Sequence, residues 1–318
     1  MAANIVQPQV SCATAREFIE ALSPIGPYFV NSKRTDGWLF RGQGKERPLV
    51  PAVFRKDDEG NYLWSRTLQV GRDLTDFGQF LLAERDMVIR FFHIADRRGL
   101  ILPDDSQEMR TRIETVMSRR GDDLVSAYEL SSWEYTDHAV LSQASLVALA
   151  QHYGIPTRLL DWTRSPFVAM FFAAESAVKY AQKASADDYL VVWAFLFPYL
   201  SKFDPEAKDN APIRIITAPS ATNSNLKAQQ GVFTLVKLRD ALEDGNYSPL
   251  DKILERFAEQ NEAQVEGFQL RKFTLPVSEA DELLQLLAKL DITPSVIYPG
   301  YQSIIDDLRM EGRWSKPK

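Results

Sequence analysis

The chain has little cysteine and little histidine, with one cysteine and three histidines among 318 residues. Cys12 has no partner for an internal disulfide, which fits a reducing compartment and leads us to expect a cytoplasmic protein. His93, His138 and His152 are scattered and lack the closely spaced Cys or His ligands that zinc sites use. We therefore expect no metal site.

Long apolar runs are absent too. A membrane-spanning helix needs ~20 consecutive apolar residues. The richest stretches, residues 166–174 and 189–197, fall well short of that length. Residues 1–10 lack the basic segment and following apolar segment that mark a signal peptide. These absences predict a soluble protein with no membrane partner.

Positive charge is not in excess, and the common nucleotide motifs are missing. The chain carries 37 Lys and Arg against 43 Asp and Glu, a net charge of −6. Such a chain is a poor general binder of nucleic acid, because that affinity comes from Lys and Arg neutralising phosphates. Gly42 and Gly44 lack the third glycine of a dinucleotide-binding loop, and Lys45 is followed by Glu46 rather than by the Ser or Thr of a P-loop. No G-x-S-x-G nucleophile elbow is present.

Helical patterns concentrate before residue 158 and strand patterns after it. Helices are predicted over residues 72–98, 106–119, 140–153, 167–180, 278–290 and 302–309. Capping boxes are predicted at Thr14–Glu17 and at Ser278 with Asp281, and surface loops at residues 202–210 and 241–248. Strands are predicted over residues 37–42, 157–163, 189–197, 213–217, 231–237, 267–275 and 295–298. Segregation of this kind favours an α+β fold with a mixed or antiparallel sheet. We expect one domain over residues 1–318, with a helical insertion at 65–137 that adds a helical layer.

Arg41 closes the first apolar strand, which is an unusual place for an arginine. Its planar guanidinium suits a phosphate or a carboxylate. Gly42 follows and allows a ligand or another backbone to approach closely. A buried ion pair with Asp161 or Glu84 explains Arg41 equally well.

The segment 152–166, HYGIPTRLLDWTRSP, places polar residues where a strand ends and a helix begins. Ser165 and Pro166 form a good N-cap and first-turn pair for the apolar helix that follows. A helix N-terminus that faces polar strand-end residues is a natural anion site. The alternative is that Asp161 and Thr163 only organise this turn.

Two later segments complete the set of candidate site segments. Gln229 and Gln230 precede a glycine and a strand, and their amides both donate and accept hydrogen bonds. Tyr298 and Pro299 stand where they could close one side of a cleft. For either segment, a structural role as a turn is an equally good explanation.

In this order, the four segments resemble the FRG-domain family, named for its Phe-Arg-Gly motif. Phe40-Arg41-Gly42-Gln43 carries that motif, residues 152–166 give the longest match, and residues 228–234 and 298–299 add further likeness. The resemblance spans roughly residues 38–308, without the stretch near 100–137. It implies a bacterial or phage protein, often in a setting of defence or toxicity.

The layout is also similar, more weakly, to the ADP-ribosyltransferase superfamily, whose split sheet binds NAD. Arg41, the Asp161–Thr163 segment and Gln229 occupy comparable places as catalytic candidates. On this reading Arg41 binds the pyrophosphate or nicotinamide ribose, and a carboxylate stabilises positive charge on the ribose. Gln229 is neutral, so Asp161 would have to supply that charge. Further ligand-binding candidates are Gly42, Gln43, Tyr153, Arg158, Trp162, Thr163 and Gln230, with Tyr153 or Trp162 stacking on a ring.

Two other functions fit the same residues. One is a non-catalytic module that binds a nucleotide, a nucleic-acid end or a protein. The other is a hydrolase with Asp161 or Glu84 as the base. Whether the chain is an enzyme stays open at this point, as does the identity of a protein or nucleic-acid acceptor. The geometric prediction is that Arg41, Asp161, Thr163 and Gln229 line one cleft.

Overall fold

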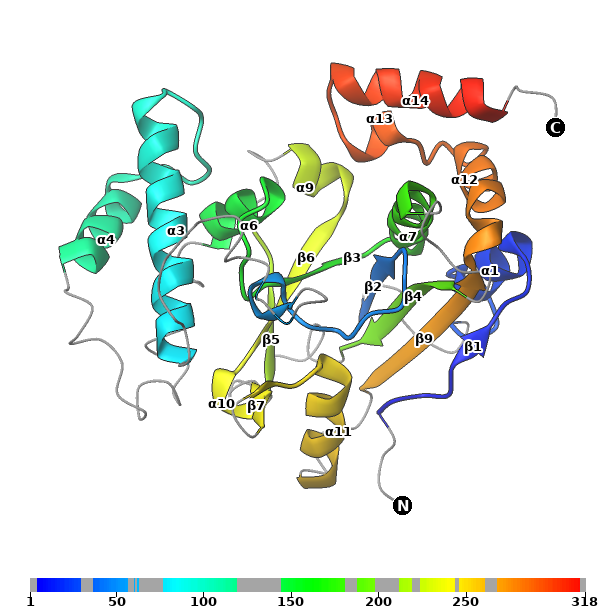
Figure 1. The fold of residues 1–318 in the computed structure, drawn as a ribbon, viewed down its shortest axis with the longest axis horizontal. Coiled ribbons are helices and arrows are strands. Elements are labelled where there is room, and N and C mark those ends of the chain that lie inside the picture. Colours follow the sequence, from blue (N-terminus) through cyan, green and yellow to red (C-terminus); the bar gives the residue numbers. More distant parts are fainter. Residues whose placement is uncertain are drawn as a thin grey trace.

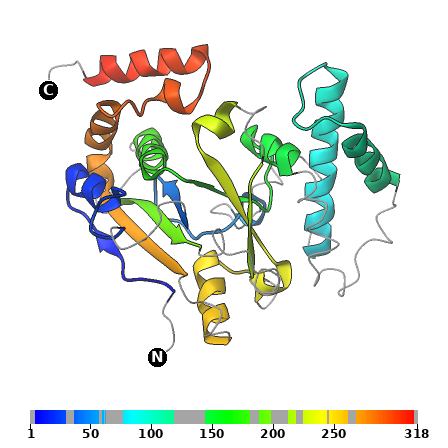
Figure 2. The ribbon, with the colours of Figure 1, turned by 180° about the vertical axis from the view of Figure 1, so that it is seen from behind.

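The computed structural model describes residues 5–29, 37–56, 60, 62, 77–118, 144–180, 188–197, 212–218, 224–243, 246–260 and 268–314. Within these residues a mixed sheet lies at the centre, helices cover both of its faces, and a helical unit stands to one side (Figure 1). The view from behind shows the same layers (Figure 2). The predicted α+β class is confirmed.

Seven strands form the main sheet in the order β1-β9-β4-β2-β3-β6-β5. Their bounds are β1 (Val10–Ser11), β2 (Trp38–Gln43), β3 (Leu160–Thr163), β4 (Tyr189–Leu196), β5 (Ile213–Ile216), β6 (Gly231–Val236) and β9 (Gln269–Pro276). The β1–β9 pair is parallel and the other pairs are antiparallel, so the sheet is mixed. A separate two-stranded ribbon joins β7 (Leu242–Glu243) to β8 (Asn246–Tyr247).

The sheet is nearly divided between β2 and β3. All six residues of β2 pair with β4, and all four residues of β3 pair with β6. Between β2 and β3 the register holds only one pair, Phe40 with Thr163. Beyond that pair the two strands separate, and the residues at the gap come from both halves of the sheet.

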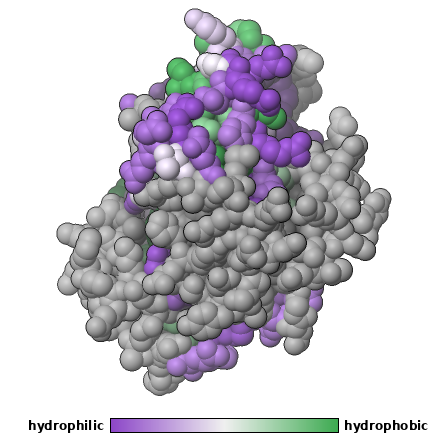
Figure 3. Space-filling model, turned by 90° about the vertical axis from the view of Figure 1, so that its left-hand side faces the viewer, coloured by the Kyte–Doolittle hydropathy of each residue, from purple (hydrophilic) through white to green (hydrophobic). Residues whose placement is uncertain are grey.

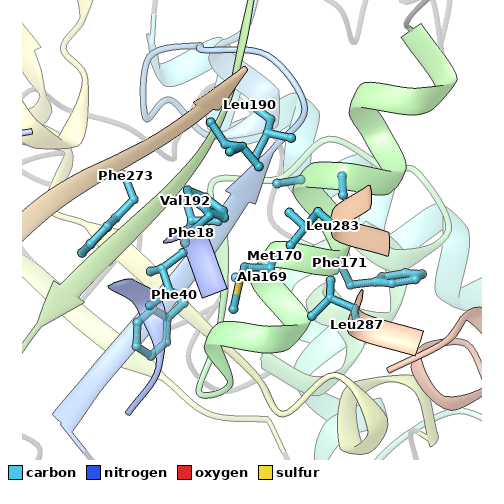
Figure 4. Close-up of a cluster of buried hydrophobic side chains, with 14 of the residues drawn as sticks. Phe18, Phe40, Ala169, Met170, Phe171, Leu190, Val192, Phe273, Leu283 and Leu287 are labelled. Atoms are coloured by element: carbon cyan, nitrogen blue, oxygen red, sulfur yellow. The ribbon is translucent and has the colours of Figure 1, made fainter. Parts of the chain in front are cut away.

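One face of the half built from β2, β4 and β9 is covered by α7 (Pro166–Tyr180), α1 (Ala15–Leu22) and α12 (Ala280–Ala288). Side chains at alternate strand positions, Phe40, Val192 and Phe273, meet the helices there (Figure 4). In α7, Met170, Phe171 and Ala174 are fully buried and Phe167 is partly buried. The prediction of a buried apolar helix is therefore confirmed, and α7 forms the centre of this core.

The opposite face carries a second core under α11 (Leu250–Gln260). Leu39, Trp162 and Phe195 point to this side and pack with Leu254 of the helix. Since strand side chains alternate between faces, Arg41 and Gln43 begin on the same side as Leu39, whereas Asp161 and Thr163 lie on the α7 side. Arg41 and Asp161 therefore approach the gap from opposite faces.

A third core joins β5 and β6 to a helical unit of α3 (Phe77–Arg97), α4 (Gln107–Ser118) and α6 (Ala144–His152). Phe92, Ile113 and Leu146 are buried in it. Its outer face is mainly hydrophilic where the residues are described (Figure 3). Both α3 and α4 fall in the predicted insertion at 65–137, whose status as an insertion stays a prediction.

Five short helices complete the described fold, namely α9 (Ser224–Ala228), α10 (Leu238–Ala241), α13 (Pro294–Ile297) and the 3-10 turns at Ala52–Phe54 and Val277–Glu279, together with the longer α14 (Tyr301–Trp314). Among the described residues, no helix combines the length and apolarity needed to cross a membrane.

Three local predictions were wrong. Residues 295–298 form no strand, because Pro294 stands in the first turn of α13 and favours a helix start. Residues 241–248, expected as a loop, contain the β7–β8 ribbon. The predicted cap at Ser278 and Asp281 does not form, since the cap position of α12 is Glu279 without a side-chain bond. The capping box at Thr14 is confirmed, with Glu17 N donating to its Oγ1 at 3.3 Å. The predicted surface loop at 202–210 lies outside the described residues.

Candidate functional site

A pocket of about 420 Å³ opens over the gap between β2 and β3. Its volume lies within the range of small-molecule sites, ~300–1,000 Å³. The floor comes from β2, β3 and β6, one wall from α6, another from α7, and the remaining side from α9 and the residue that follows α13. The lining residues are Phe40, Arg41, Gly42, Ala148, Gln151, His152, Asp161, Trp162, Thr163, Phe172, Leu226, Gln229, Gly231, Phe233 and Tyr298.

The geometric prediction is confirmed, because Arg41, Asp161, Thr163 and Gln229 all line this one pocket. They come from β2, from β3 and from the turn between α9 and β6. Segments 120 and 66 residues apart meet here because the sheet order places β2 next to β3 and β3 next to β6.

Arg41 and Asp161 form an ion pair across the gap. Arg41 Nη1 lies 2.6 Å from Asp161 Oδ2 and also donates to the Asp161 carbonyl oxygen at 2.7 Å. The arginine side chain is 9% exposed, whereas the aspartate side chain is 59% exposed toward the pocket. Arg41 Nε is buried and has no hydrogen-bond partner among the described residues. The ion-pair explanation of Arg41 is therefore correct for Asp161, and the pair is itself part of the pocket.

Gly42 lets β2 lie directly against α7. A Cβ at this position would meet the Ala169 carbonyl oxygen at 2.0 Å and the Ala173 nitrogen at 2.8 Å. A Cβ at Gly44 would lie 2.5 Å from the Ala177 nitrogen and from Ser176 Oγ, so this position is also held close to α7. The close approach that Gly42 permits is thus made by a helix backbone. It fixes Arg41, the neighbouring residue, against the wall of the pocket.

The turn from α6 into β3 brings Gln151 to Asp161. Gly154, at φ +93°, ends α6, and its nitrogen donates to the Gln151 carbonyl at 2.9 Å. The chain then turns back, so that Thr157 Oγ1 donates to Gln151 Oε1. Gln151 Nε2 in turn donates to Asp161 Oδ1 at 3.2 Å.

Thr163 ties the end of β3 to two neighbouring turns. Its hydroxyl donates to the Gln229 carbonyl at 2.7 Å and accepts from Ser165 N at 3.1 Å. Ser165 Oγ accepts from Val168 N at 3.4 Å and caps α7, as predicted. Because its hydroxyl is used in both directions and the residue is 3% exposed, Thr163 organises the site.

The Asp161 carboxyl is ionised at neutral pH. Burial raises its pKa, but the charges of Arg41 and Arg55, the backbone N–H of Asp161 and the Arg41 hydrogen bond outweigh burial, so the pKa lies below its usual value. Burial, followed by the nearby charge of Arg41, lowers the pKa of Arg55 to about 10, which still leaves it protonated. Of these two arginines Arg41 lines the pocket, and its guanidinium beside Asp161 suits an anionic group.

His152 stands at the side of the pocket as a neutral imidazole. Partial burial lowers its pKa. Its Nε2 lies 3.0 Å from Asn225 Nδ2, and because an amide nitrogen only donates, Nε2 is the acceptor. This contact joins the end of α6 to α9.

The side of the pocket opposite α6 is aromatic. Phe172 and Tyr298 lie with ring centroids 6.0 Å apart. Tyr298 Oη donates to Glu175 Oε2 at 3.0 Å, and burial together with the Glu175 charge raises the tyrosine pKa. Tyr298 therefore stays a neutral hydroxyl, and the wall offers flat apolar surface to a ligand ring.

Several predicted ligand-binding residues do not reach the pocket with their side chains. Trp162 contributes to the lining, but its indole lies in the α11-side core with Nε1 bonded to Thr234 at 3.0 Å, so it does not stack on a ligand. Tyr153 is 69% exposed and packs on Phe91, outside the lining. Gln43 accepts from Trp193 Nε1 on the far face of the sheet.

Arg158 is also structural. Its Nε and its backbone nitrogen both donate to Glu84 at 2.6 Å, and both residues are buried outside the pocket lining. This pair ties α3 to the start of β3 and removes Glu84 as a candidate base. Gln230 adopts φ +48° and accepts from Arg164 N, so it shapes the turn before β6.

Sequence reasoning missed Gln151 and Phe172 in the lining, and Arg55, whose charge acts on Asp161 from outside the lining. Gln151 immediately precedes the His152 segment, so its position beside that motif was an available signal. Arg55 follows a short 3-10 turn, and nothing in the sequence pointed to it. In the part of the chain that the structure describes, no three His, Cys, Asp or Glu side chains gather as a metal site.

Comparison with known protein families agrees with part of this picture. Residues 103–182 match the family model described as the FRG domain. The match contains the 152–166 segment, α6, β3 and α7, and it begins inside the stretch predicted as an insertion. Arg41 and Gln229 lie outside the matched residues. No curated protein and no solved structure matches the chain.

Proposed function

The chain contains an FRG domain, and we propose that its pocket binds an NAD-like nucleotide and transfers ADP-ribose from it. The observation that carries this proposal is the meeting of the Arg41–Asp161 pair and Gln229 over the β2–β3 gap. An ionised carboxylate, the guanidinium of Arg41 and an aromatic wall are three environments that suit a dinucleotide with a positively charged nicotinamide ring.

The proposed binding mode follows from the charges. Arg41 faces the phosphates, because a guanidinium donates two parallel hydrogen bonds to phosphate oxygens. Phe172 and Tyr298 offer their faces to a ring. Asp161 has a carboxylate that is open to the pocket and carries negative charge where the sheet divides.

The proposed reaction breaks the bond between the nicotinamide nitrogen and C1′ of the ribose. Nicotinamide leaves with the electron pair of that bond and becomes neutral, while positive charge develops on the ribose. Asp161 stabilises that charge, and an acceptor nucleophile then bonds to C1′ and loses its proton. Gln229 contributes an amide to the pocket and no charge, so Asp161 is the carboxylate that this mechanism depends on.

Two substitutions test the proposal. Arg41→Lys keeps the charge but loses the planar fork, so calorimetry should show NAD binding weakened by about tenfold or more. Asp161→Asn should leave binding within a few fold and lower nicotinamide release by roughly 10²–10³-fold, since mainly the transition state loses its charge partner. Arg309→Lys, on the exposed face of α14, is the matched control and should behave as wild type.

The ion pair between Arg41 and Asp161 favours a second function. Asp161 is already neutralised in part by Arg41, and Gln229 is uncharged, as in a module that binds a nucleotide without turning it over. On that reading wild type binds NAD, releases no nicotinamide, and loses affinity and stability together in Asp161→Asn. Well-folded wild type that fails to bind NAD would remove the transferase and leave a module that binds another nucleotide, a nucleic-acid end or a protein. The bacterial or phage defence or toxin setting is a further proposal and rests on the family resemblance.

A further inference from the structure

We propose that Gln151 is a positioning residue that sets the direction of the Asp161 carboxylate in the pocket. The inference rests on the proposed function for its meaning, since a fixed carboxylate matters only if a ligand or a reacting bond lies in front of it. Its physical basis is a chain of hydrogen bonds that runs from the interior through Gln151 to Asp161.

This chain of hydrogen bonds begins at Thr157, which is completely buried. Its Oγ1 accepts from Leu159 N at 3.2 Å, so its single proton is free to be donated. That proton goes to Gln151 Oε1. The oxygen of the Gln151 amide is therefore held toward the interior.

The opposite end of the amide must then face Asp161. Gln151 Nε2 lies 3.2 Å from Asp161 Oδ1, and an amide nitrogen donates to a carboxylate. A reversed amide would place its oxygen against the negative charge of Asp161. Both neighbours of Gln151 thus select the same orientation, and the amide has one stable direction in this site.

The two carboxylate oxygens consequently have different partners. Oδ2 pairs with Arg41 Nη1 at 2.6 Å, and Oδ1 accepts from Gln151. Rotation of the carboxylate about its Cβ–Cγ bond would break both contacts. The remaining acceptor capacity of Asp161 is therefore held toward the pocket, where the side chain is exposed.

Gln151→Met tests the idea, because methionine has a similar length and no donor. We expect about tenfold weaker NAD binding, or an equal loss in nicotinamide release, from the lost hydrogen bond to a charged group. In an Asp161→Asn background the same substitution should cost much less, because residues that act through one another are non-additive. Gln285→Met, the same change on the exposed side of α12, is the matched control.

A second measurement does not depend on a ligand. Carboxyl NMR titration of the ligand-free protein should give a higher pKa for Asp161 in Gln151→Met than in wild type, since a donor to the charged form is lost. Gln285→Met should leave that pKa unchanged. An unchanged Asp161 pKa in folded Gln151→Met would overturn the inference even if NAD binds. Absence of NAD binding by wild type would overturn the proposed function, while the titration would still decide the role of Gln151.

Discussion

Gly42 permits a contact between β2 and α7 that no other residue allows, and Gly42→Ala measures how closely the two elements are held. The added Cβ would lie 2.0 Å from the Ala169 carbonyl oxygen, about 1.5 Å inside an ordinary contact distance. Both nearest atoms belong to the backbone of α7, so no side-chain rotation relieves the clash. The strand or the helix must move, and we expect a loss of roughly 3 kcal/mol in the free energy of unfolding, the upper part of the range for overpacked cores.

Urea denaturation followed by circular dichroism measures this loss, and Gly312→Ala is its matched control. Gly312 lies in α14 with nothing within 4 Å of the added Cβ, so the same substitution should stabilise the protein by roughly 0.5–1 kcal/mol through helix propensity. The two variants should therefore shift the midpoint in opposite directions. A Gly42→Ala midpoint equal to that of wild type would refute the close β2–α7 contact and, with it, the argument that α7 fixes Arg41.

Phe171→Ala should lower the free energy of unfolding by roughly 3–5 kcal/mol, because it removes a fully buried ring and leaves a cavity under α12; a thermal midpoint within error of wild type would contradict the buried position. Glu84→Gln should cost roughly 3–5 kcal/mol in a urea titration, because it leaves the buried Arg158 charge unpaired. If Glu84→Gln unfolds as wild type does, the pair does not hold α3 to β3.

Much of the fold could be predicted because strand ends and helix starts have strong local signals. The apolar run at 189–197 and the cap at Ser165 give β4 and α7 to within one or two residues. Arg41, Asp161 and Gln229 could be grouped because the pattern predicted each near the end of a strand or in the turn before one, although Arg41 and Asp161 lie inside β2 and β3. Polar residues at such ends gather where neighbouring strands meet, and the sheet order makes their strands neighbours.

The remaining features depend on pairings that local pattern does not encode. Glu84 meets Arg158 across 74 positions, so Arg158 appeared as a ligand residue although it is already satisfied inside the fold. Trp162 follows Asp161 directly, and strand alternation sends its ring to the opposite face, away from the pocket. A prediction that groups residues by nearness in sequence therefore assigns neighbours such as Asp161 and Trp162 to one site, although their side chains lie on opposite faces of the sheet. Arg55 reaches Asp161 only through the tertiary fold.

The narrow join between β2 and β3 also has a mechanical consequence. A sheet resists bending across its strands because each ladder of main-chain hydrogen bonds stiffens its neighbour. Between β2 and β3 that ladder is reduced to one residue pair, and a salt bridge between side chains spans the rest of the gap. The two halves of the sheet are therefore joined by a short main-chain connection, and the Arg41–Asp161 ion pair holds them together across the gap. A ligand that competes for either side chain would weaken this ion pair as it enters. The width of the pocket would therefore change with the ligand that it holds.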